Sequence, residues 1–484
     1  MNRILGIFRK DARHLWPQAL LFWAVLGVAA AIDPLPDNRH SSSLMHQLPA
    51  LLQPLACWLL AVSAIHGERL IGPEQYWLTR PYSWKHLMAA KALFLVVFVN
   101  LPLLVCQVAT LAALGISPLA WLPALLWRQV FFSVFFILPA AAVAAVTRNL
   151  GQVLLAGILL YATLSAGFGL ILMIRGGYPD WGGLGWIREC GTALVVAAGT
   201  AVALKLQYSR RRTALSRSVL AGTVALAMLV MTAPRWGGAF AIQRLFSRER
   251  IGDSAVRISF VESLSDMHPS SWTTNSSDPP GVRLEIPVRL DDIPRGAMLG
   301  TDQISVSLNS ARGTWRSGWQ TFYALHALSN GTAWLTVYVD PNFYNAYPDA
   351  AVEIDAALDL TLSRRVRTIS VERGRTVVPE IGICTIEIMP VESRSRCYSP
   401  FQRVSFGLAW ASPAIPEETS RNGPYAPFPT SAGFRPLDAD SLSFGQGYRE
   451  YGKLSLVMDR PVAHVQRNFH VRGLRMRQFR FSER

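Results

Sequence analysis

Charged residues are scarce in this chain. Asp, Glu, Lys and Arg make up 16% of its 484 residues, whereas soluble domains carry about 25%. The shortage is local, because charges are sparse between Leu20 and Trp236 and ordinary in number from Arg244 onward. This asymmetry excludes a wholly soluble protein and predicts a membrane domain followed by an exposed domain.

Acidic residues are also few, with 32 Asp and Glu against 47 Lys and Arg, which gives a net charge of +15. A basic balance can indicate a nucleic-acid partner. Here many basic residues flank apolar runs, where membrane topology accounts for them. No zinc-ligand spacing or RNA-binding motif accompanies them, so we expect no nucleic-acid partner.

Cysteine is rare, with five residues in the chain. Cys57 and Cys106 lie inside apolar runs and are expected to be packing residues. Cys384 and Cys397 bracket a short strand-and-turn stretch in the second half. They form a disulfide if that half lies outside the cytoplasm, and are two free thiols otherwise.

The N-terminus lacks the uninterrupted apolar core of a cleavable signal peptide. Charged residues alternate there with Ile4, Leu5, Ile7 and Phe8. We therefore predict that residues 1–16 form an amphipathic helix that lies on the membrane surface.

Catalytic motifs are missing from the second half, which has no HExxH, GxSxG or CxxC. The segment from Gly447 to Lys453 matches most of a phosphate-binding loop, but Leu454 takes the place of the Ser or Thr that ligates magnesium. A strand-like run follows where a helix should begin. We expect neither enzyme activity nor a metal or cofactor in this chain.

The first half contains apolar runs of the length that a membrane helix requires, about 20 residues. They predict about seven spans in residues 17–236, the first and last being the shortest: Pro17–Ile32, Gln47–Ile65, Ala89–Leu114, Leu126–Val146, Val153–Ile174, Gly191–Leu206 and Val219–Ala233. Arg128, beside Trp121 and Trp127, is interpreted as an interfacial anchor whose side chain reaches water; a substrate contact is the alternative.

Basic residues are concentrated in alternate loops, which predicts the orientation of the bundle. They occur before the first span, after the second, after the fourth and after the sixth, and the other loops are neutral or balanced by acids. The N-terminus is thus predicted to be cytoplasmic and the second half to lie outside. Arg244, Arg248 and Arg250 follow the seventh span and oppose this orientation, but a late, long domain is weak evidence.

The second half shows short runs of alternating apolar and polar residues between turn-forming residues. This pattern predicts a mostly-β, sandwich-like domain over residues 252–484, reached through a linker at 237–251. The stretches 278–281 and Pro424–Pro436 are expected to be loops. The predicted strands lie at Val256–Val261, Val282–Val288, Ile304–Leu308, Trp334–Val339, Val352–Leu360, Val404–Trp410 and Leu454–Met458.

The loop between the second and third spans, His66–Lys91, carries the most specific pattern. Gly72-Pro73 starts a turn, about one helical turn follows, and Pro81 ends it. Ser83 is a suitable N-cap for the helix that enters the third span. A short element of this kind on the cytoplasmic side can transmit force from a docked subunit into the membrane helices.

This loop resembles that of the membrane subunit of ABC transporters of the type-two exporter class. In that family an acidic residue and a glycine precede a leucine, and Arg-Pro-x-Ser and a lysine at the base of the next span follow. The corresponding positions here are Glu68, Gly72, Leu78, Arg80-Pro81-Tyr82-Ser83 and Lys91. The cluster Arg9-Lys10-Asp11 is similar to the family's entry helix, and Thr147-Arg148-Asn149 looks like its loop before the fifth span.

The resemblance covers roughly residues 1–210 and implies a permease subunit of an ATP-driven exporter in a bacterial inner membrane. A second permease subunit, identical or different, would pair with it, and each would dock an ABC ATPase that holds ATP and magnesium. The residues implied in docking are Glu68, Arg69, Gly72, Tyr76, Trp77, Arg80, Pro81, Ser83, Trp84, Lys85 and Lys91.

The chain departs from the family in its seventh span and its large C-terminal domain. Two other functions therefore remain open. One is a membrane sensor or assembly protein that transports nothing and binds a ligand through its outer β-domain. The other is a membrane-anchored hydrolase with a site in residues 252–484.

Overall fold

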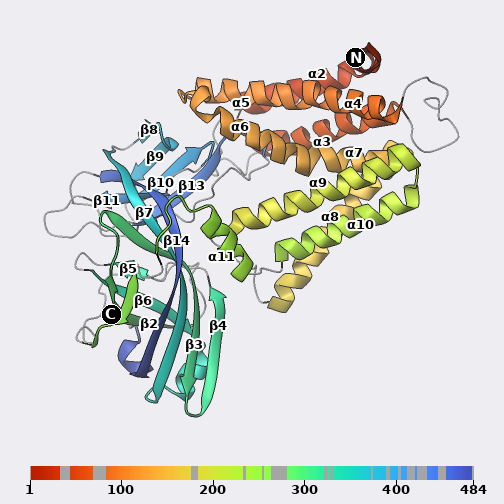
Figure 1. The fold of residues 1–484 in the computed structure, drawn as a ribbon. Helices are drawn as coiled ribbons and strands as arrows, with labels where there is room; N and C mark the ends of the chain where they lie inside the picture. Colours follow the sequence, from red (N-terminus) through yellow and green to blue (C-terminus); the bar gives the residue numbers. More distant parts are fainter. Residues whose placement is uncertain are drawn as a thin grey trace.

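The computed structural model shows a helical N-terminal half followed by a mostly-β C-terminal region (Figure 1). It describes residues 2–32, 44–68, 83–175, 184–232, 236–252, 256–262, 281–320, 325–327, 331–371, 374–388, 393–401, 405–410, 420–421, 433–444 and 454–481.

Eleven helices are described in the N-terminal half, and two of the predicted spans are interrupted by short π-helical segments, η3 and η4. The bounds are α1 (Asn2–His14), α2 (Trp16–Ile32), α3 (Leu44–His66), α4 (Trp84–Leu95), η3 (Val96–Asn100), α5 (Leu101–Ala113), α6 (Pro118–Phe132), η4 (Ser133–Ile137), α7 (Leu138–Ala145), α8 (Leu150–Arg175), α9 (Gly185–Arg210), α10 (Thr213–Thr232) and α11 (Trp236–Leu245).

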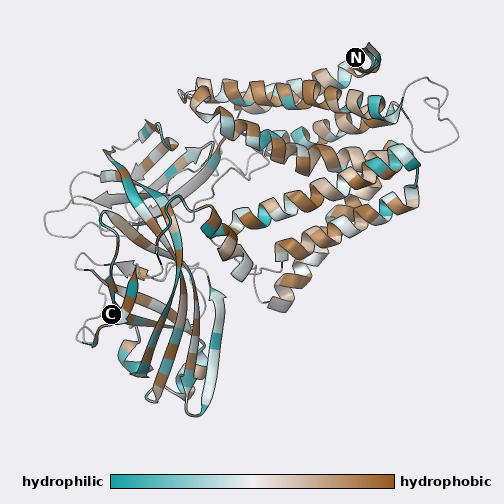
Figure 2. Cartoon of the chain, viewed as in Figure 1, coloured by the Kyte–Doolittle hydropathy of each residue, from teal (hydrophilic) through white to brown (hydrophobic). Residues whose placement is uncertain are grey.

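Five of these helical stretches are long and apolar enough to cross a membrane: Trp84–Ala113, Pro118–Ala145, Leu150–Ile171, Gly185–Arg210 and Thr213–Thr232. Their apolar residues cover the outside of the bundle as well as its inside (Figure 2). On α8, Ile158 is 65% exposed and Leu155 56% exposed. Such a continuous apolar surface is suited to lipid and unsuited to water.

Each of the seven predicted spans overlaps a helix or a pair of consecutive helices. The first two are the least certain by length and composition, because α1 and α2 are bent by 69° at Leu15 and the apolar part of α3 is only Leu51–His66. The predicted linker at 237–251 is not wholly a loop, since α11 occupies its first part. Phe240 of α11 is buried and packs against Trp319.

The π-helical segment η3 precedes a proline. Pro102 has no backbone N–H and leaves the carbonyl of Phe98, four residues earlier, without its helical donor. The indole Nε1 of Trp23 on α2 donates to this carbonyl at 3.0 Å, and the rings of Trp23 and Phe98 stack. The carbonyl that the helical hydrogen-bond pattern leaves free at η3 is thus satisfied by a side chain of the neighbouring helix α2.

The two ends of the bundle have separate cores. At one end α1, α3, α4, α7 and α9 share a core that contains Ile7, Leu87 and Tyr208. At the other end Leu111, Leu114 and Trp121 pack against the β-rich region. The helices therefore run between a free end, which bears α1, and an end that the β-rich region covers (Figure 1).

The described residues of the β-rich region form three antiparallel sheets, with strand orders β1-β2-β6-β5, β13-β10-β9-β8 and β12-β11-β14-β7-β3-β4. The bounds are β1 (Arg257–Phe260), β2 (Val282–Asp291), β3 (Ala297–Ser310), β4 (Gly313–Gln320), β5 (Leu325–Ala327), β6 (Thr332–Val339), the short helix α12 (Pro341–Ala346), β7 (Ala351–Ser370), β8 (Gly374–Val378), β9 (Gly382–Ile388), β10 (Ser393–Ser399), β11 (Ser405–Trp410), β12 (Ser420–Arg421), β13 (Asp438–Phe444) and β14 (Leu454–Arg475).

The six-stranded sheet packs against both four-stranded sheets. Its strands β3, β7 and β14 share one core with β2 and β6. Farther along β7 and β14, Ile369, Leu456 and Met458 share a second core with β8, β9 and β10. The long strands β7 and β14 therefore contribute to both cores, and the mostly-β, antiparallel character that the alternation predicts is confirmed.

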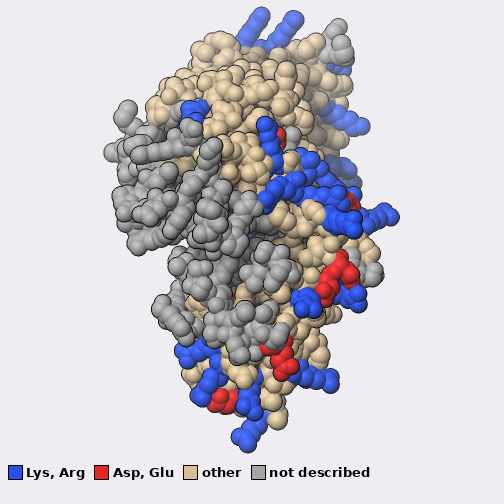
Figure 3. All heavy atoms as spheres, turned by 90° about the vertical axis from the view of Figure 1, so that its left-hand side faces the viewer, with Lys and Arg blue, Asp and Glu red and all other residues tan. Residues whose placement is uncertain are grey.

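All seven predicted strand runs fall on strands, most of them longer than predicted. Several strands were missed, among them β9 and three strands whose sequences are rich in Ser, Gly or Arg: β4, β10 and β13. The face of this region seen in Figure 3 carries basic side chains, which are arginines in the described residues, with fewer Asp and Glu. Exposed pairs such as Arg364–Glu249 are typical of a surface in water.

Candidate functional site

The free end of the bundle contains a buried ion pair between α1 and α4. Lys91 Nζ donates to Asp11 Oδ2 at 2.8 Å, and the two side chains are 2% and 4% exposed. Asp11 reaches Lys91 because Ile7 of α1 packs into the core beneath it. Helix α1 is amphipathic, so its apolar face fixes it against the bundle while Arg9 and Arg13 remain exposed.

A second pair joins α1 to the end of α3. Lys10 forms an ion pair with Glu68, whose side chain is buried while that of Lys10 is 41% exposed. Glu68 and Lys91 flank residues 69–82 on the two sides. Glu68, just after α3, and Lys91, in α4, are therefore both bonded to α1.

Other hydrogen bonds join the helix ends on the same side of the bundle. The ring of His66 lies 3.0 Å from the carbonyl of Ala144, and Arg217 Nη2 donates to the carbonyl of Val146 at 2.9 Å. Ala144 belongs to the last turn of α7 and Val146 is its C-cap residue, so both carbonyls lie where the regular helical hydrogen bonds end. The ends of α3, α7 and α10 are thus held together beside α1.

The middle of the predicted docking loop lies outside the described residues: Arg69, Gly72, Tyr76, Trp77, Arg80 and Pro81. Of the described members, Ser83 is the N-cap residue of α4, but its hydroxyl pairs with His86 Nδ1 at 2.7 Å instead of capping the helix. Trp84 packs against the core of this end, and Lys85 lies over its ring. The structure therefore brings Glu68 and Lys91 together through α1 and leaves Lys85 exposed.

The opposite end of the bundle contains a second buried cation. Arg128 is 1% exposed, and its Nη1 donates to Asp438 Oδ2 at 2.6 Å. The interpretation of Arg128 as an interfacial anchor is wrong. Its side chain does not reach water, because residues of the β-rich region cover it and supply an anion.

Polar side chains continue from Arg128 into the bundle. Gln129 Nε2 donates to Gln107 Oε1 at 2.9 Å, and Gln107 Nε2 donates to the carbonyl of Phe434 at 3.1 Å. Sequence reasoning missed both glutamines and Phe434. A usable signal was present, since glutamines inside apolar spans are costly unless they find partners.

The β9–β10 hairpin carries the disulfide of the structure, between Cys384 and Cys397. These residues are directly opposite each other on the two strands. The neighbouring residues Ile383 and Tyr398 pack against the helical bundle, so the disulfide supports the strands that cover the end of the bundle.

Among the described residues, no group of three or more His, Cys, Asp or Glu could hold a metal ion. No protein-family model matches the sequence, and no curated protein matches it either.

Proposed function

We propose that this chain is the permease subunit of an ATP-driven exporter and that a separate ABC ATPase docks at the free end of the bundle, on Glu68–Lys91. The observation that carries the proposal is the pairing of four charged residues. Lys10, Asp11, Glu68 and Lys91 come from the two segments that resemble the family, and they form two ion pairs with each other.

These pairs suit a force-transmitting element. A push on residues 69–82 acts on α3 through Glu68 and on α4 through Lys91, and α1 links the two. ATP binding by the docked subunit would favour one arrangement of the bundle, and hydrolysis would release it. ATP and magnesium would be held by that subunit, and two permease subunits would pair, as identical or different chains.

The distribution of charge supports a cytoplasmic free end in the inner membrane of a bacterium. The N-terminal segment, the end of α9 with Arg210–Arg212, and Arg148 all lie at this end. Basic residues favour the cytoplasmic side. Seven crossings, counting α2 and α3 as spans, then place the β-rich region outside.

Docking can be tested by co-expressing the full chain with an ABC ATPase from the same genome. We expect the wild type to retain the ATPase through purification, and Arg80→Ala and Trp84→Ala to lose both the ATPase and the stimulated ATP turnover. Arg212→Ala is the matched control, because Arg212 is a basic residue at the same end but outside the loop. Unchanged assembly in the loop variants would contradict the docking assignment.

The orientation has its own test. A cysteine in place of Trp77 should react with an impermeant maleimide only from the cytoplasmic side of sealed vesicles. Reaction from the opposite side would exclude docking by a cytoplasmic ATPase.

A non-transporting sensor is the second candidate, favoured by the direct contact between the β-rich region and Arg128. In a sensor, a ligand of the outer region would change the bundle without an ATPase. A chain that responds to such a ligand but never co-purifies with a nucleotide-binding subunit would support the sensor over the exporter.

A further inference from the structure

Residues 434–438 of the β-rich region, here called the plug, enter the covered end of the helical bundle. The ring of Phe434 lies 4.9 Å from that of Phe132 and 5.6 Å from that of Phe136, both edge to face. These phenylalanines belong to the core that α2, α3 and α5 share. A residue some three hundred positions along the chain thus fills an aromatic site between membrane helices.

The backbone of the plug is bound by polar side chains of the bundle. Gln107 donates to the carbonyl of Phe434, and Arg128 Nη2 donates to the carbonyl of Arg435 at 2.5 Å. Gln107 is itself held by Gln129. The bundle therefore presents oriented N–H donors at its covered end, where the apolar surroundings strengthen each bond.

Arg128 supplies the charge of this site. It is buried, and it binds the carboxylate of Asp438 through both Nη atoms, at 2.6 and 3.4 Å. Its Nε is buried without a hydrogen-bond partner. Asp438 is 54% exposed. The cation therefore belongs permanently to the bundle, whereas its anion lies at the surface and can be replaced.

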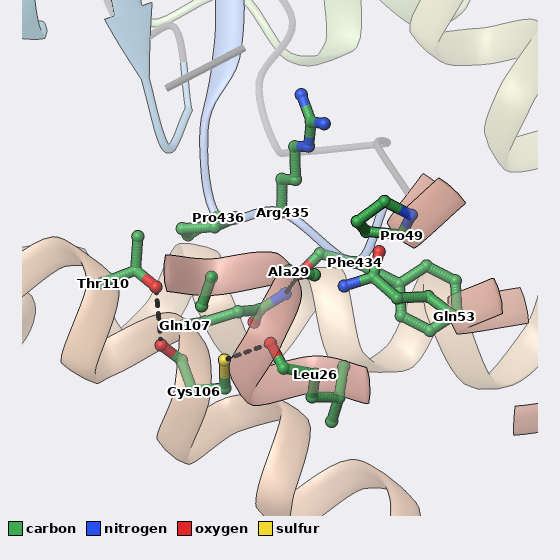
Figure 4. A pocket seen from close by; sticks show the side chains of 11 residues that line it. Leu26, Ala29, Pro49, Gln53, Cys106, Gln107, Thr110, Phe434, Arg435 and Pro436 are labelled. Carbon is green, nitrogen blue, oxygen red and sulfur yellow. Dashed lines mark hydrogen bonds between the residues drawn. The ribbon is translucent and has the colours of Figure 1, made fainter. Parts of the chain in front are cut away.

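A pocket continues beneath the plug, as Figure 4 shows. Leu26 and Ala29 of α2, Gln53 of α3, and Cys106 and Thr110 of α5 line it, and the plug closes it. The walls are apolar with isolated amide and hydroxyl groups. The cavity left beside the seated plug has a volume of about 30 Å³, so an apolar chain can enter only where the plug is withdrawn. Arg128 lies outside this lining and holds the plug through Asp438 and the carbonyl of Arg435.

We propose that this pocket and the plug site bind an anionic amphiphile, and that the plug occupies part of the site when the ligand is absent. The groups of the plug define the ligand. The Phe434 ring stands for an apolar group, its carbonyl for an ester or amide carbonyl, and the Asp438 carboxylate for a phosphate or carboxylate head. Arg128 is suited to both heads, because its planar N–H groups match either anion.

Ligand and plug then compete for the same donors. The apparent affinity equals the intrinsic affinity multiplied by the fraction of molecules in which the plug is withdrawn, so a seated plug weakens binding. Weakening the plug without altering the bundle should therefore tighten binding. The site can be tested on the chain alone, so its failure is separate from a failure of ATPase docking.

The test uses the full chain with Cys57→Ser and Cys190→Ser in dodecyl maltoside, where Cys106 reports access to the pocket. The probes are dodecyl phosphate and dodecanoate, which separate the two head groups, and dodecanol is the uncharged control. We expect Asp438→Asn to raise labelling of Cys106 by a maleimide and to tighten binding of the anionic probes about tenfold. Bound probe should then protect Cys106.

The matched control is Asp349→Asn, which removes a carboxylate from an exposed pair with Arg477 outside the plug; it should change neither quantity. Arg128→Gln should abolish the preference for anionic probes over dodecanol. If that variant does not fold, Phe434→Ala gives the second test, since it also opens the pocket. Equal binding of dodecanol and dodecyl phosphate, or unchanged labelling in Asp438→Asn and Phe434→Ala, would overturn the proposal.

Discussion

The two ends of the helical bundle each contain a buried cation, but they treat its partner differently. At the free end both Lys91 and Asp11 are buried. At the covered end Arg128 is buried while half of the Asp438 side chain is exposed. Opening the first pair would leave two charges in apolar surroundings, whereas opening the second leaves only one, because Asp438 can be hydrated. The first pair is suited to a permanent joint and the second to a contact that opens.

The largest predicted effect concerns Lys91. Lys91→Met leaves Asp11 buried and unpaired, and we expect a loss of about 3–5 kcal/mol in the free energy of unfolding. Asp11→Leu in the same chain should restore much of it. Arg364→Ala removes one member of the exposed pair with Glu249 and should cost less than about 1 kcal/mol. Thermal denaturation of the purified chain checks this order, and equal losses in Lys91→Met and Arg364→Ala would remove the distinction between a buried and a surface pair.

The disulfide tests how firmly the covered end is held. Cys384 and Cys397 are 13 positions apart, and cross-linking a loop of this size stabilises by about 3 kcal/mol. Replacing both by alanine should expose the β8–β9–β10 strands to limited proteolysis and release the bond from Arg375 to the carbonyl of Leu114. The melting of the bundle should stay unchanged. Two reactive thiols in membranes purified under alkylating conditions would contradict the oxidised form.

The covered pair should respond unequally to removal of its two members. Asp438→Ala leaves a buried guanidinium without its anion and should cost about 2 kcal/mol. Arg128→Met should cost less, because Asp438 remains hydrated and the methionine fills the apolar space. Thermal denaturation of both variants measures the difference. For Asp11 and Lys91 we expect removal of either member to cost the same. Equal losses of unfolding free energy in Asp438→Ala and Arg128→Met would therefore contradict the difference between the two ends.

The smallest effect concerns pH at another junction, where the segment after α11 meets β14. The backbone N–H of His464 donates to Ser247, and its ring contacts Thr361. Nearby Glu249 pairs with Arg364. Burial lowers the pKa of His464 from its ordinary value of 6.5 to about 4.

The unfolded chain therefore binds a proton at a higher pH than the folded chain. Stability is complete above about pH 6.5 and falls as the pH decreases toward 4. Because His464 retains some exposed surface, we expect a loss of only about 1–2 kcal/mol over that interval. His464→Gln should flatten this part of the pH profile of thermal stability. A wild-type profile identical to that of His464→Gln would contradict the assignment.

Local sequence patterns located most of the elements. Long apolar runs marked the helices because every backbone group in lipid must bond within its own segment. Alternation marked strands such as the first part of β7, where buried residues alternate with exposed or half-buried ones. It missed β10, whose sequence Ser393–Ser399 is mostly polar and which is held by β9, β13 and a disulfide. Such a strand has little local signal of its own.

The site was less predictable than the fold. The motif indicated Glu68 and Lys91, but not that Asp11, 80 positions earlier, is the partner of Lys91. Asp438 is 310 positions from Arg128. Pairs of this kind depend on tertiary packing, which no local period encodes. The buried charge itself was the readable sign, because a lone cation between apolar helices requires an anion from some other part of the chain.

The continuous pairing of β7 with β14 has a mechanical consequence. The 20 residues of β7 span about 65 Å when extended, and they are paired along almost their whole length, with register shifts near Pro461 and at two other places. Both cores of the β-rich region rest on this one ribbon. A change in the tilt of the strands next to the bundle would therefore displace the opposite end of the ribbon, which carries the core shared with β2 and β6. A molecule bound to that end could in turn exert force on the membrane helices.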